Sequence, residues 1–264
     1  MTRTVRSEWT KLRTQRGTLI ALVTMAVVMV GMTAFFAAES ETDAVLGGDD
    51  DVVQMGLAGI VFAQIAVVVV GASLITTEFG SGMIRTTLTA TQSRLRVLVA
   101  KALVVSAAVF PPALVSSALA FVAAQALLRD RGYVAPGYPP VELTDPKAVR
   151  AVAGTALLLT AYALIALGLG TLIRHSGAAI AVAAGLVFLP FLFIGAFPDH
   201  IARRIEQLTP LAGMAIQSTT GRMLSAFDGG PGMPIGPWQG LGVAFAWALG
   251  ALTLGFLALR YRDV

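Results

Sequence analysis

Six long apolar runs dominate the sequence and restrict the fold more than any other feature. They cover residues 18–38, 55–75, 98–128, 151–173, 177–197 and 241–259. About 20 apolar residues are enough for a helix to cross a hydrocarbon core of roughly 30 Å. Backbone groups in lipid must be satisfied within their own segment, which favours helices. Only 13% of the residues are charged, against about 25% in soluble domains. We therefore predict an all-α integral membrane protein with one domain, residues 1–264.

The distribution of basic residues predicts the orientation in the membrane. An even number of spans places both termini on one side. Segments on that side hold twelve of the nineteen Lys and Arg residues, and the other side holds seven. Lys and Arg accumulate in cytoplasmic segments, so we expect both termini to be cytosolic. The sequence pI is about 9.8, but the basic residues spread along one membrane face. This pattern indicates a lipid bilayer as partner and excludes nucleic acid.

The segment that precedes the first run is basic and amphipathic. Within residues 2–16, Val5, Trp9 and Leu12 follow helical spacing, and basic residues occupy the rest. Such a helix lies in the plane of the membrane interface. The alternative is a disordered basic tail that orients the first span.

Two further stretches depart from simple spans and loops. The third run is longer than the hydrocarbon thickness, so it must tilt, kink or project into the cytosol, and Pro111-Pro112 gives it a reason to kink. In the connection 198–237, Ile201, Ile205 and Leu208 recur at helical spacing, and a second apolar turn starts at Pro210. We predict an outer or re-entrant helix pair there; the alternative is a surface loop with chance periodicity.

The connector between the second and third runs is too long to be a simple turn. Gly80 and Gly82 permit a sharp bend, and Ser93 can cap the next helix. Between them the sequence predicts a short amphipathic helix. One side carries Met83, Ile84, Thr87 and Leu88, and the other carries Arg85 and Thr89. An apolar stripe outside the bilayer needs a cover, which could be the chain itself, the lipid surface or another protein.

The sequence of this connector resembles that of a connector in a known family of membrane proteins. The pattern Glu78-x-Gly-x-Gly-x-Ile-Arg-Thr-Thr-Leu, followed by Arg94 and Lys101, is similar to the connector in permease subunits of type-2 ATP-binding-cassette exporters. That family often has a proline before the arginine, where this chain has Gln92-Ser93. In the family the connector is the coupling helix, which docks on a cytosolic P-loop ATPase. The family also carries an in-plane elbow helix before its first span and a helix pair between its fifth and sixth.

The resemblance implies specific roles. The ATPase-coupling residues would be Glu78, Gly80, Gly82, Met83, Ile84, Arg85, Thr86, Thr87, Leu88, Arg94 and Lys101. In this reading Met83, Ile84 and Leu88 fill an apolar groove on the ATPase, while Arg85, Arg94 and Lys101 make polar contacts. Glu78 would pair with Arg94 or Arg6. Two permease copies would form the path, as a homodimer, and ATP and magnesium would bind to the partner ATPase.

The sequence shows no catalytic or cofactor motif of its own. It lacks the P-loop pattern G-x-x-x-x-G-K-[ST], as well as H-E-x-x-H and G-x-S-x-G. It has no cysteine, and His175 and His200 fall on opposite membrane faces, so we expect no metal site. Asp49-Asp50-Asp51 is expected to be a solvated acidic run. We therefore expect no catalytic residue and no cofactor in this chain.

The predicted spans are almost free of charge, with Lys101 as the exception. Ion-coupled carriers usually hold an ionisable group at membrane depth, which disfavours an ATP-independent carrier. Gln64, Ser106, Ser116 and Thr160 either form hydrogen bonds between helices or line a path at a dimer seam.

We therefore expect the permease subunit of an exporter in the plasma membrane. Its phenylalanine-bearing spans would suit an amphipathic or hydrophobic substrate, although the same side chains can simply face lipid. The alternative is a non-transporting sensor or assembly subunit.

Overall fold

The chain folds into a bundle of helices. The structure, a computed structural model, describes residues 2–40, 51–90, 93–135, 138, 140–193, 196–219 and 235–261, and no strand occurs among them. The helices are α1 (Thr2–Thr14), α2 (Arg16–Glu39), α3 (Val52–Met55), α4 (Ile60–Gly80), α5 (Met83–Ala90), α6 (Arg94–Asp130), α7 (Pro146–Ile173), α8 (Ser176–Phe193), α9 (Asp199–Leu208), the 3₁₀ helix η2 (Pro210–Gln217) and α10 (Pro237–Tyr261). Six of them, α2, α4, α6, α7, α8 and α10, are long and apolar enough to cross a membrane. The predicted all-α membrane class is confirmed.

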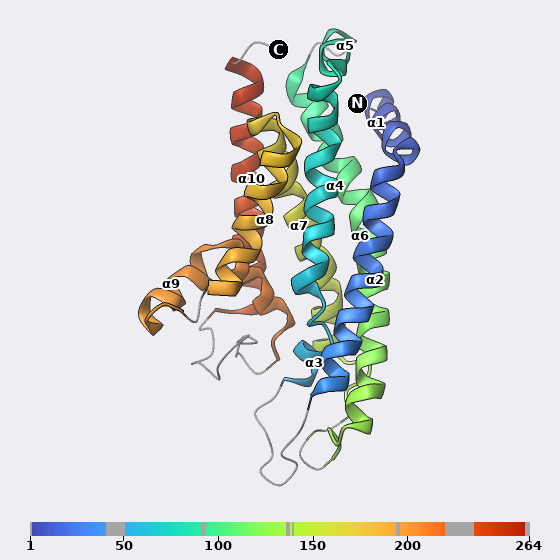
Figure 1. Cartoon of the computed structure of the whole chain (residues 1–264), viewed down its shortest axis with the longest axis vertical. Coiled ribbons are helices and arrows are strands. Elements are labelled where there is room, and N and C mark those ends of the chain that lie inside the picture. Colours follow the sequence, from blue (N-terminus) through green and yellow to red (C-terminus); the bar gives the residue numbers. More distant parts are fainter. Residues whose placement is uncertain are drawn as a thin grey trace.

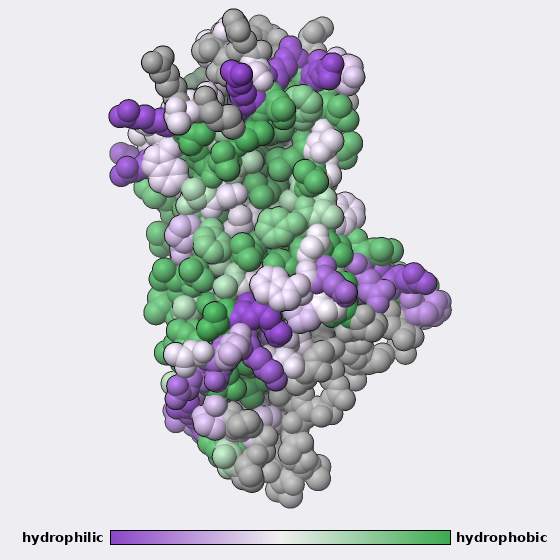
Figure 2. All heavy atoms as spheres, turned by 180° about the vertical axis from the view of Figure 1, so that it is seen from behind, coloured by the Kyte–Doolittle hydropathy of each residue, from purple (hydrophilic) through white to green (hydrophobic). Residues whose placement is uncertain are grey.

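The six long helices bring both ends of the chain to one end of the bundle. There α1, α5 and the last turn of α10 lie together, at the top of Figure 1, whereas α3 lies near the opposite end. A broad apolar band separates the hydrophilic residues of the two ends (Figure 2). Helix α7 is the most enclosed span, and α2 and α8 are the least enclosed. The exposed sides of α2 and α8 are therefore the surfaces left for lipid or for a partner.

The second span differs from the prediction in its position. The predicted run 55–75 is interrupted by a turn at residues 56–59, and α4 begins only at Ile60. A Cβ on Gly59 would lie 2.2 Å from the carbonyl oxygen of Met29, and its N–H donates to Thr33 Oγ1 (2.9 Å). Helix α4 then continues to Gly80. Glu78, the first residue of the predicted connector, is therefore a residue of the last turn of α4.

The third span is one continuous helix of 37 residues, α6, that runs through Pro111 and Pro112. At 1.5 Å per residue it is about 55 Å long, well beyond the roughly 30 Å of a hydrocarbon core. The helix continues through the two prolines and is long enough to project beyond the apolar layer, which is one of the three predicted alternatives.

A helix pair follows α8, as the periodicity predicts. Helix α9 projects sideways from the bundle (Figure 1), and the indole N–H of Trp247 donates to the carbonyl of its last residue, Leu208 (2.7 Å). All eight residues of η2 are buried, and η2 packs against α7 and α10. The Gln217 side chain donates to Thr155 Oγ1 (2.9 Å). The second helix of the pair is thus part of the core.

Asp51 is not the solvated residue that the sequence predicts. Its carboxylate is buried and caps α3 by accepting from the N–H of Gln54 (3.2 Å). It also accepts from the hydroxyl of Thr219 (2.9 Å) and from the Thr219 N–H. A buried carboxylate needs such donors. Asp49 and Asp50 lie outside the described residues.

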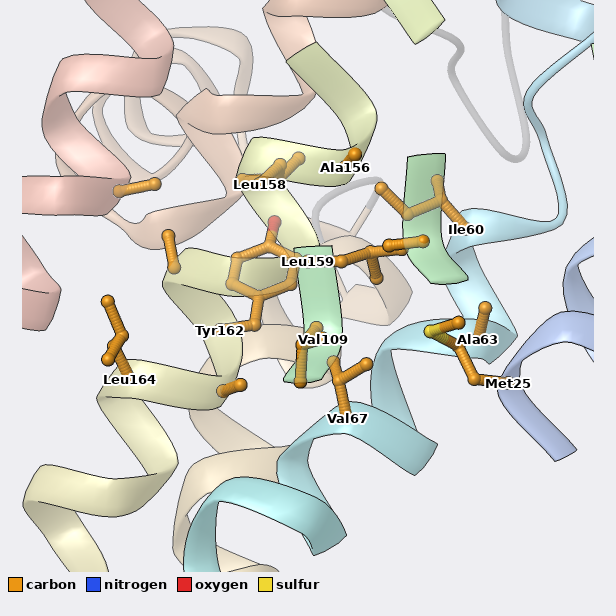
Figure 3. Packing of buried hydrophobic residues seen from close by; sticks show 14 of the residues in the cluster. Met25, Ile60, Ala63, Val67, Val109, Ala156, Leu158, Leu159, Tyr162 and Leu164 are labelled. Atoms are coloured by element: carbon orange, nitrogen blue, oxygen red, sulfur yellow. The ribbon is translucent and has the colours of Figure 1, made fainter. Parts of the chain in front are cut away.

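The core is centred on α7 and its contacts with α4, α6 and α10. Tyr162 of α7 is fully buried among aliphatic side chains (Figure 3). Its hydroxyl donates to the carbonyl of Pro210 (3.3 Å). The backbones of α4 and α7 approach so closely at Gly71 that a Cβ there would lie 2.0 Å from the carbonyl oxygen of Ala163. Small residues at such crossings let membrane helices pack tightly.

Gly71→Ala is expected to lower the free energy of unfolding by roughly 1–3 kcal/mol, because the added methyl group meets backbone that cannot move aside. Gly31→Ala is the matched control. No atom lies within 4 Å of the Cβ position at Gly31, so this variant is expected to be neutral or more stable by roughly 0.5 kcal/mol. Thermal unfolding in detergent compares the two. Equal stability of both variants would contradict the close α4–α7 packing.

Candidate functional site

The connector between α4 and α5 is a tight turn set by one glycine. Gly80 is the last residue of α4, and the backbone N–H of Ser81 still bonds to the carbonyl of Thr77 (3.0 Å). Gly82 then adopts φ of +71°, a conformation that residues with a Cβ adopt at a cost. Helix α5 begins at the next residue. Of the two glycines predicted to form the bend, Gly82 carries the unusual backbone angle.

Helix α5 presents two different faces. Ile84 is 2% exposed and belongs to the central apolar core. Met83 is 42% exposed, and Thr86 and Thr89 are exposed as well. We call these three residues the exposed face of α5. The side chains of Arg85 and Leu88 lie outside the described ones. The prediction that Ile84 fills a groove on a partner is wrong for this conformation, because its side chain already fills its own bundle.

Four charged side chains meet beneath α5, and we call Glu8, Lys11, Glu78 and Lys101 the charge cluster. Lys101 Nζ lies 2.6 Å from Glu8 Oε2 and 2.9 Å from Glu78 Oε1. Lys11 Nζ lies 3.0 Å from Glu8 Oε1 and 2.8 Å from Glu78 Oε1. Two carboxylates and two ammonium groups therefore alternate in a closed ring that joins α1, α4 and α6.

Burial makes this cluster energetically important. The side chains of Lys101, Glu8 and Glu78 are 0%, 1% and 3% exposed, and only Lys11 reaches solvent. Exposed ion pairs contribute about 0–1 kcal/mol, whereas removal of one partner from a buried pair costs roughly 3–5 kcal/mol. The cluster has no net charge as long as all four members are ionised. Loss of any one member leaves an uncompensated charge inside the protein.

Lys11 links the cluster to α5. Its ammonium group also donates to Thr87 Oγ1 of α5 (3.3 Å). Burial lowers the pKa of Lys11, but the hydrogen bonds and charges of Glu78 and Glu8 outweigh this effect and raise the pKa above its usual value. The stabilisation from this charge is therefore complete below the unfolded pKa of about 10.4 and is lost as the pH rises through the folded pKa. At neutral pH Lys11 stays charged and holds α1, α4 and α5 together.

The predicted pairing of Glu78 with Arg94 or Arg6 is wrong. Glu78 Oε1 accepts both lysines, while Glu78 Oε2 is buried and has no hydrogen-bond partner within the described chain. The predicted contact of Lys101 with the ATPase is also wrong for this conformation, because Lys101 is fully buried. Both residues belong to the charge cluster beneath α5 and not to the exposed face of α5.

Arg94 and Arg174 bind the last turn of α10. Arg94 Nη1 donates to the carbonyls of Leu259 and Arg260 (3.3 Å to the latter). Arg174 donates to the carbonyl of Ala258 (3.1 Å), and its guanidinium lies 5.1 Å from the ring centre of Phe79 at the end of α4. The last carbonyls of a helix lack intrahelical donors and attract cations. The predicted polar contact of Arg94 with the ATPase is replaced here by a contact within the chain.

The polar residues predicted to line a path are mostly internal. Gln64, Ser116 and Thr160 are buried, and Ser106 is partly exposed. Each of the four side chains bonds to a backbone carbonyl three or four residues earlier in its own helix. In this conformation the three buried residues do not face a seam with a second copy, and within the described parts of the chain their side chains form none of the alternative hydrogen bonds between helices. Ser106 stays a prediction.

Five phenylalanines form a continuous aromatic belt across α2, α4 and α8. Phe62 of α4 is central, with ring-centre distances of 6.2 Å to Phe36 and 6.3 Å to Phe188. Phe35 and Phe191 extend the belt at 5.8 and 6.4 Å. Phe35, Phe36 and Phe62 are each more than a third exposed. The belt lies on the two least enclosed spans and the helix between them.

Glu8 and Lys11 are the members of the cluster that sequence reasoning did not find. Two signals point to them in retrospect. Glu8 is the only acidic residue of α1 and lies at helical spacing between Val5 and Leu12, which turn inward. Lys101 is the only charge in the predicted spans, and a buried ammonium requires a carboxylate. Within the described residues, no group of three or more His, Cys, Asp or Glu side chains could hold a metal ion.

Comparison with known proteins adds one finding. A family model described as ABC-2 family transporter protein matches residues 4–189, which run from α1 through most of α8 and contain the whole charge cluster and α5. No curated protein matches the chain.

Proposed function

The chain belongs to the ABC-2 family of transporter membrane proteins, and on that premise we propose that this permease subunit exports its substrate across the plasma membrane. Its family implies a separate ATPase as partner. The proposal rests on α5, a short helix at the end of the bundle that has one exposed face and lies over the buried charge cluster. In the proposal both termini and α5 face the cytosol.

The exposed face of α5 is the proposed contact for the ATPase. Met83 supplies the apolar contact and Thr86 and Thr89 the surrounding polar surface; Arg85 and Leu88 remain proposed partners. Gly80 ends α4, and Gly82 sets the angle of the turn into α5. Movement of α5 would pass through the Lys11–Thr87 contact and through Glu78 to α1, α4 and α6. ATP and magnesium would bind to the ATPase, so this chain itself catalyses no reaction.

Reconstitution tests this proposal directly. The chain is purified from its native membrane, and the copurifying P-loop ATPase is identified by mass spectrometry. Its ATP turnover is then measured in vesicles with and without this chain. We expect turnover to rise when the chain is added. Copurification of a kinase or regulator without such an ATPase would favour a sensor or assembly role.

A second copy of the chain is proposed to pack along α2, α4 and α8, with the aromatic belt facing the path between the two copies. Rings that remain exposed in one chain offer apolar, polarisable surface to a bound amphipath. This placement supports an amphipathic or hydrophobic substrate.

Phe62→Ala is expected to reduce ATP-driven efflux of a dansyl-labelled alkyl amphipath from proteoliposomes by roughly five- to tenfold. The reason is that one aromatic contact contributes about 1 kcal/mol. Phe193→Ala is the control, because Phe193 is also exposed on α8 but lies outside the belt. If both variants transported equally well, the belt would not be part of the path.

A further inference from the structure

An apolar groove runs along the outer side of α1, where this helix lies against α6. It has a volume of about 350 Å³, a size typical of small-ligand sites. From α1 it is lined by Val5, Arg6 and Trp9, and from α6 by Leu103, Val104 and Ala107. Leu103 is 50% exposed, so the groove opens toward the surroundings of the bundle.

The charge cluster fixes which face of α1 lines this groove. Glu8 points inward to Lys101 (2.6 Å). The groove residues of α1 are Thr2, Val5, Arg6 and Trp9. Their i, i+3, i+4, i+7 spacing places them on one stripe of the helix, next to the face that carries Glu8. The groove is therefore a preformed feature of the docked helix.

Charge identifies the occupant. Arg6 is exposed, and no residue in the described parts of the chain forms an ion pair with it. Arg13, the other arginine of α1 whose side chain the structure describes, is exposed too, whereas Glu8 and Lys11 are engaged in the charge cluster. An apolar groove that is bordered by an exposed arginine side chain fits a hydrocarbon chain attached to an anion. Helix α1 packs against α6 and α2, two of the six helices that are long and apolar enough to cross a membrane. The available molecule of this chemistry is therefore a bilayer lipid.

We propose that the groove between α1 and α6 binds an anionic phospholipid of the adjacent leaflet, with one acyl chain against Leu103, Val104 and Ala107 and the phosphate at Arg6. Guanidinium groups bind phosphate through paired hydrogen bonds. Trp9 borders the bound chain, at the depth where tryptophans favour the membrane interface. The lipid binds to α1, the helix that supplies Glu8 and Lys11 to the charge cluster. Its binding therefore stabilises the packed position of α1 and, through it, the charge cluster beneath α5.

Trp9 makes the site measurable by fluorescence. The chain has three tryptophans, so the variant W238F/W247F leaves Trp9 as the only indole. This variant is placed in phosphatidylcholine vesicles that contain either brominated phosphatidylglycerol or brominated phosphatidylcholine, and quenching of Trp9 is followed against mole fraction. One basic side chain at an anionic surface corresponds to a preference of roughly fivefold. We expect the anionic lipid to reach half-quenching at a mole fraction lower by about this factor.

Two further variants separate a site from general attraction. Arg6→Gln is expected to abolish the preference, whereas Arg13→Gln, an exposed arginine of α1 outside the groove, is expected to retain it. Ala107→Phe fills the groove and is expected to reduce quenching by both lipids. Equal quenching by the two lipids, or equal loss in R6Q and R13Q, would overturn the proposal. No ATPase takes part, so the outcome is independent of the proposed export function.

Discussion

Lys101→Met is expected to lower the free energy of unfolding by roughly 3–5 kcal/mol, the largest loss for any single charge that we expect in this chain. Without Lys101, two buried carboxylates share one ammonium group, and the charge cluster carries a net negative charge in an apolar environment. Thermal or denaturant unfolding in detergent measures the change. Arg96→Gln, on an exposed side chain of the same helix, is expected to stay within about 0.5 kcal/mol of the original protein.

A second substitution distinguishes a charge imbalance from a simple loss of packing. In Glu8→Leu/Lys101→Met the remaining Glu78 and Lys11 form one neutral pair at 2.8 Å. Replacement of a buried ion pair by apolar residues of similar volume is often neutral. The double variant is therefore expected to recover most of the stability that Lys101→Met loses. A double variant whose losses simply add would show that Glu8 and Lys101 are not energetically coupled.

Met83→Asp is expected to weaken binding of the partner ATPase by at least roughly thirtyfold, the effect of losing an interface residue worth about 2 kcal/mol. Met83 is exposed, so its replacement is expected to leave the stability of the chain unchanged. Binding of the ATPase to the reconstituted chain and its ATP turnover measure the effect.

Ile84→Asp is the informative comparison, because the two residues are adjacent in sequence. A carboxylate at Ile84 would be buried in the core without a partner, so we expect a loss of several kcal/mol of stability. If Ile84→Asp instead folded normally and lost only ATPase binding, Ile84 would be the docking residue and α5 would present a different face to the partner.

The hydropathy pattern was sufficient to predict the class of the fold and its principal elements. Apolar runs long enough to cross a bilayer have few alternatives to helices, and the basic amphipathic pattern predicted α1. The boundary of the second span was wrong because a turn at Gly59 fits against Met29 and Thr33. Such a contact depends on a helix that is distant in sequence, so periodicity within one segment does not contain it.

The candidate site was predicted at the level of the segment but not of the side chain. The motif correctly located α5, yet periodicity does not say which side of a short helix faces its own bundle, and Ile84 turned inward. Arg94 and Lys101 could be read as surface cations because a sequence does not show burial. The partners Glu8 and Lys11 lie 93 and 67 positions from Lys101 and Glu78, respectively, and only the packing of α1 brings them together.

The central claim is that the exposed face of α5 docks on an ATPase, and cysteine cross-linking tests it most directly. The chain has no cysteine of its own, so Thr86→Cys creates a unique attachment point for a benzophenone maleimide. Val134→Cys is the matched control, exposed but just beyond the opposite end of α6. After irradiation of native membranes, mass spectrometry identifies the adducts. We predict a P-loop ATPase peptide joined to residue 86 and none joined to residue 134; an ATPase adduct at residue 134 but not at residue 86 would contradict the account.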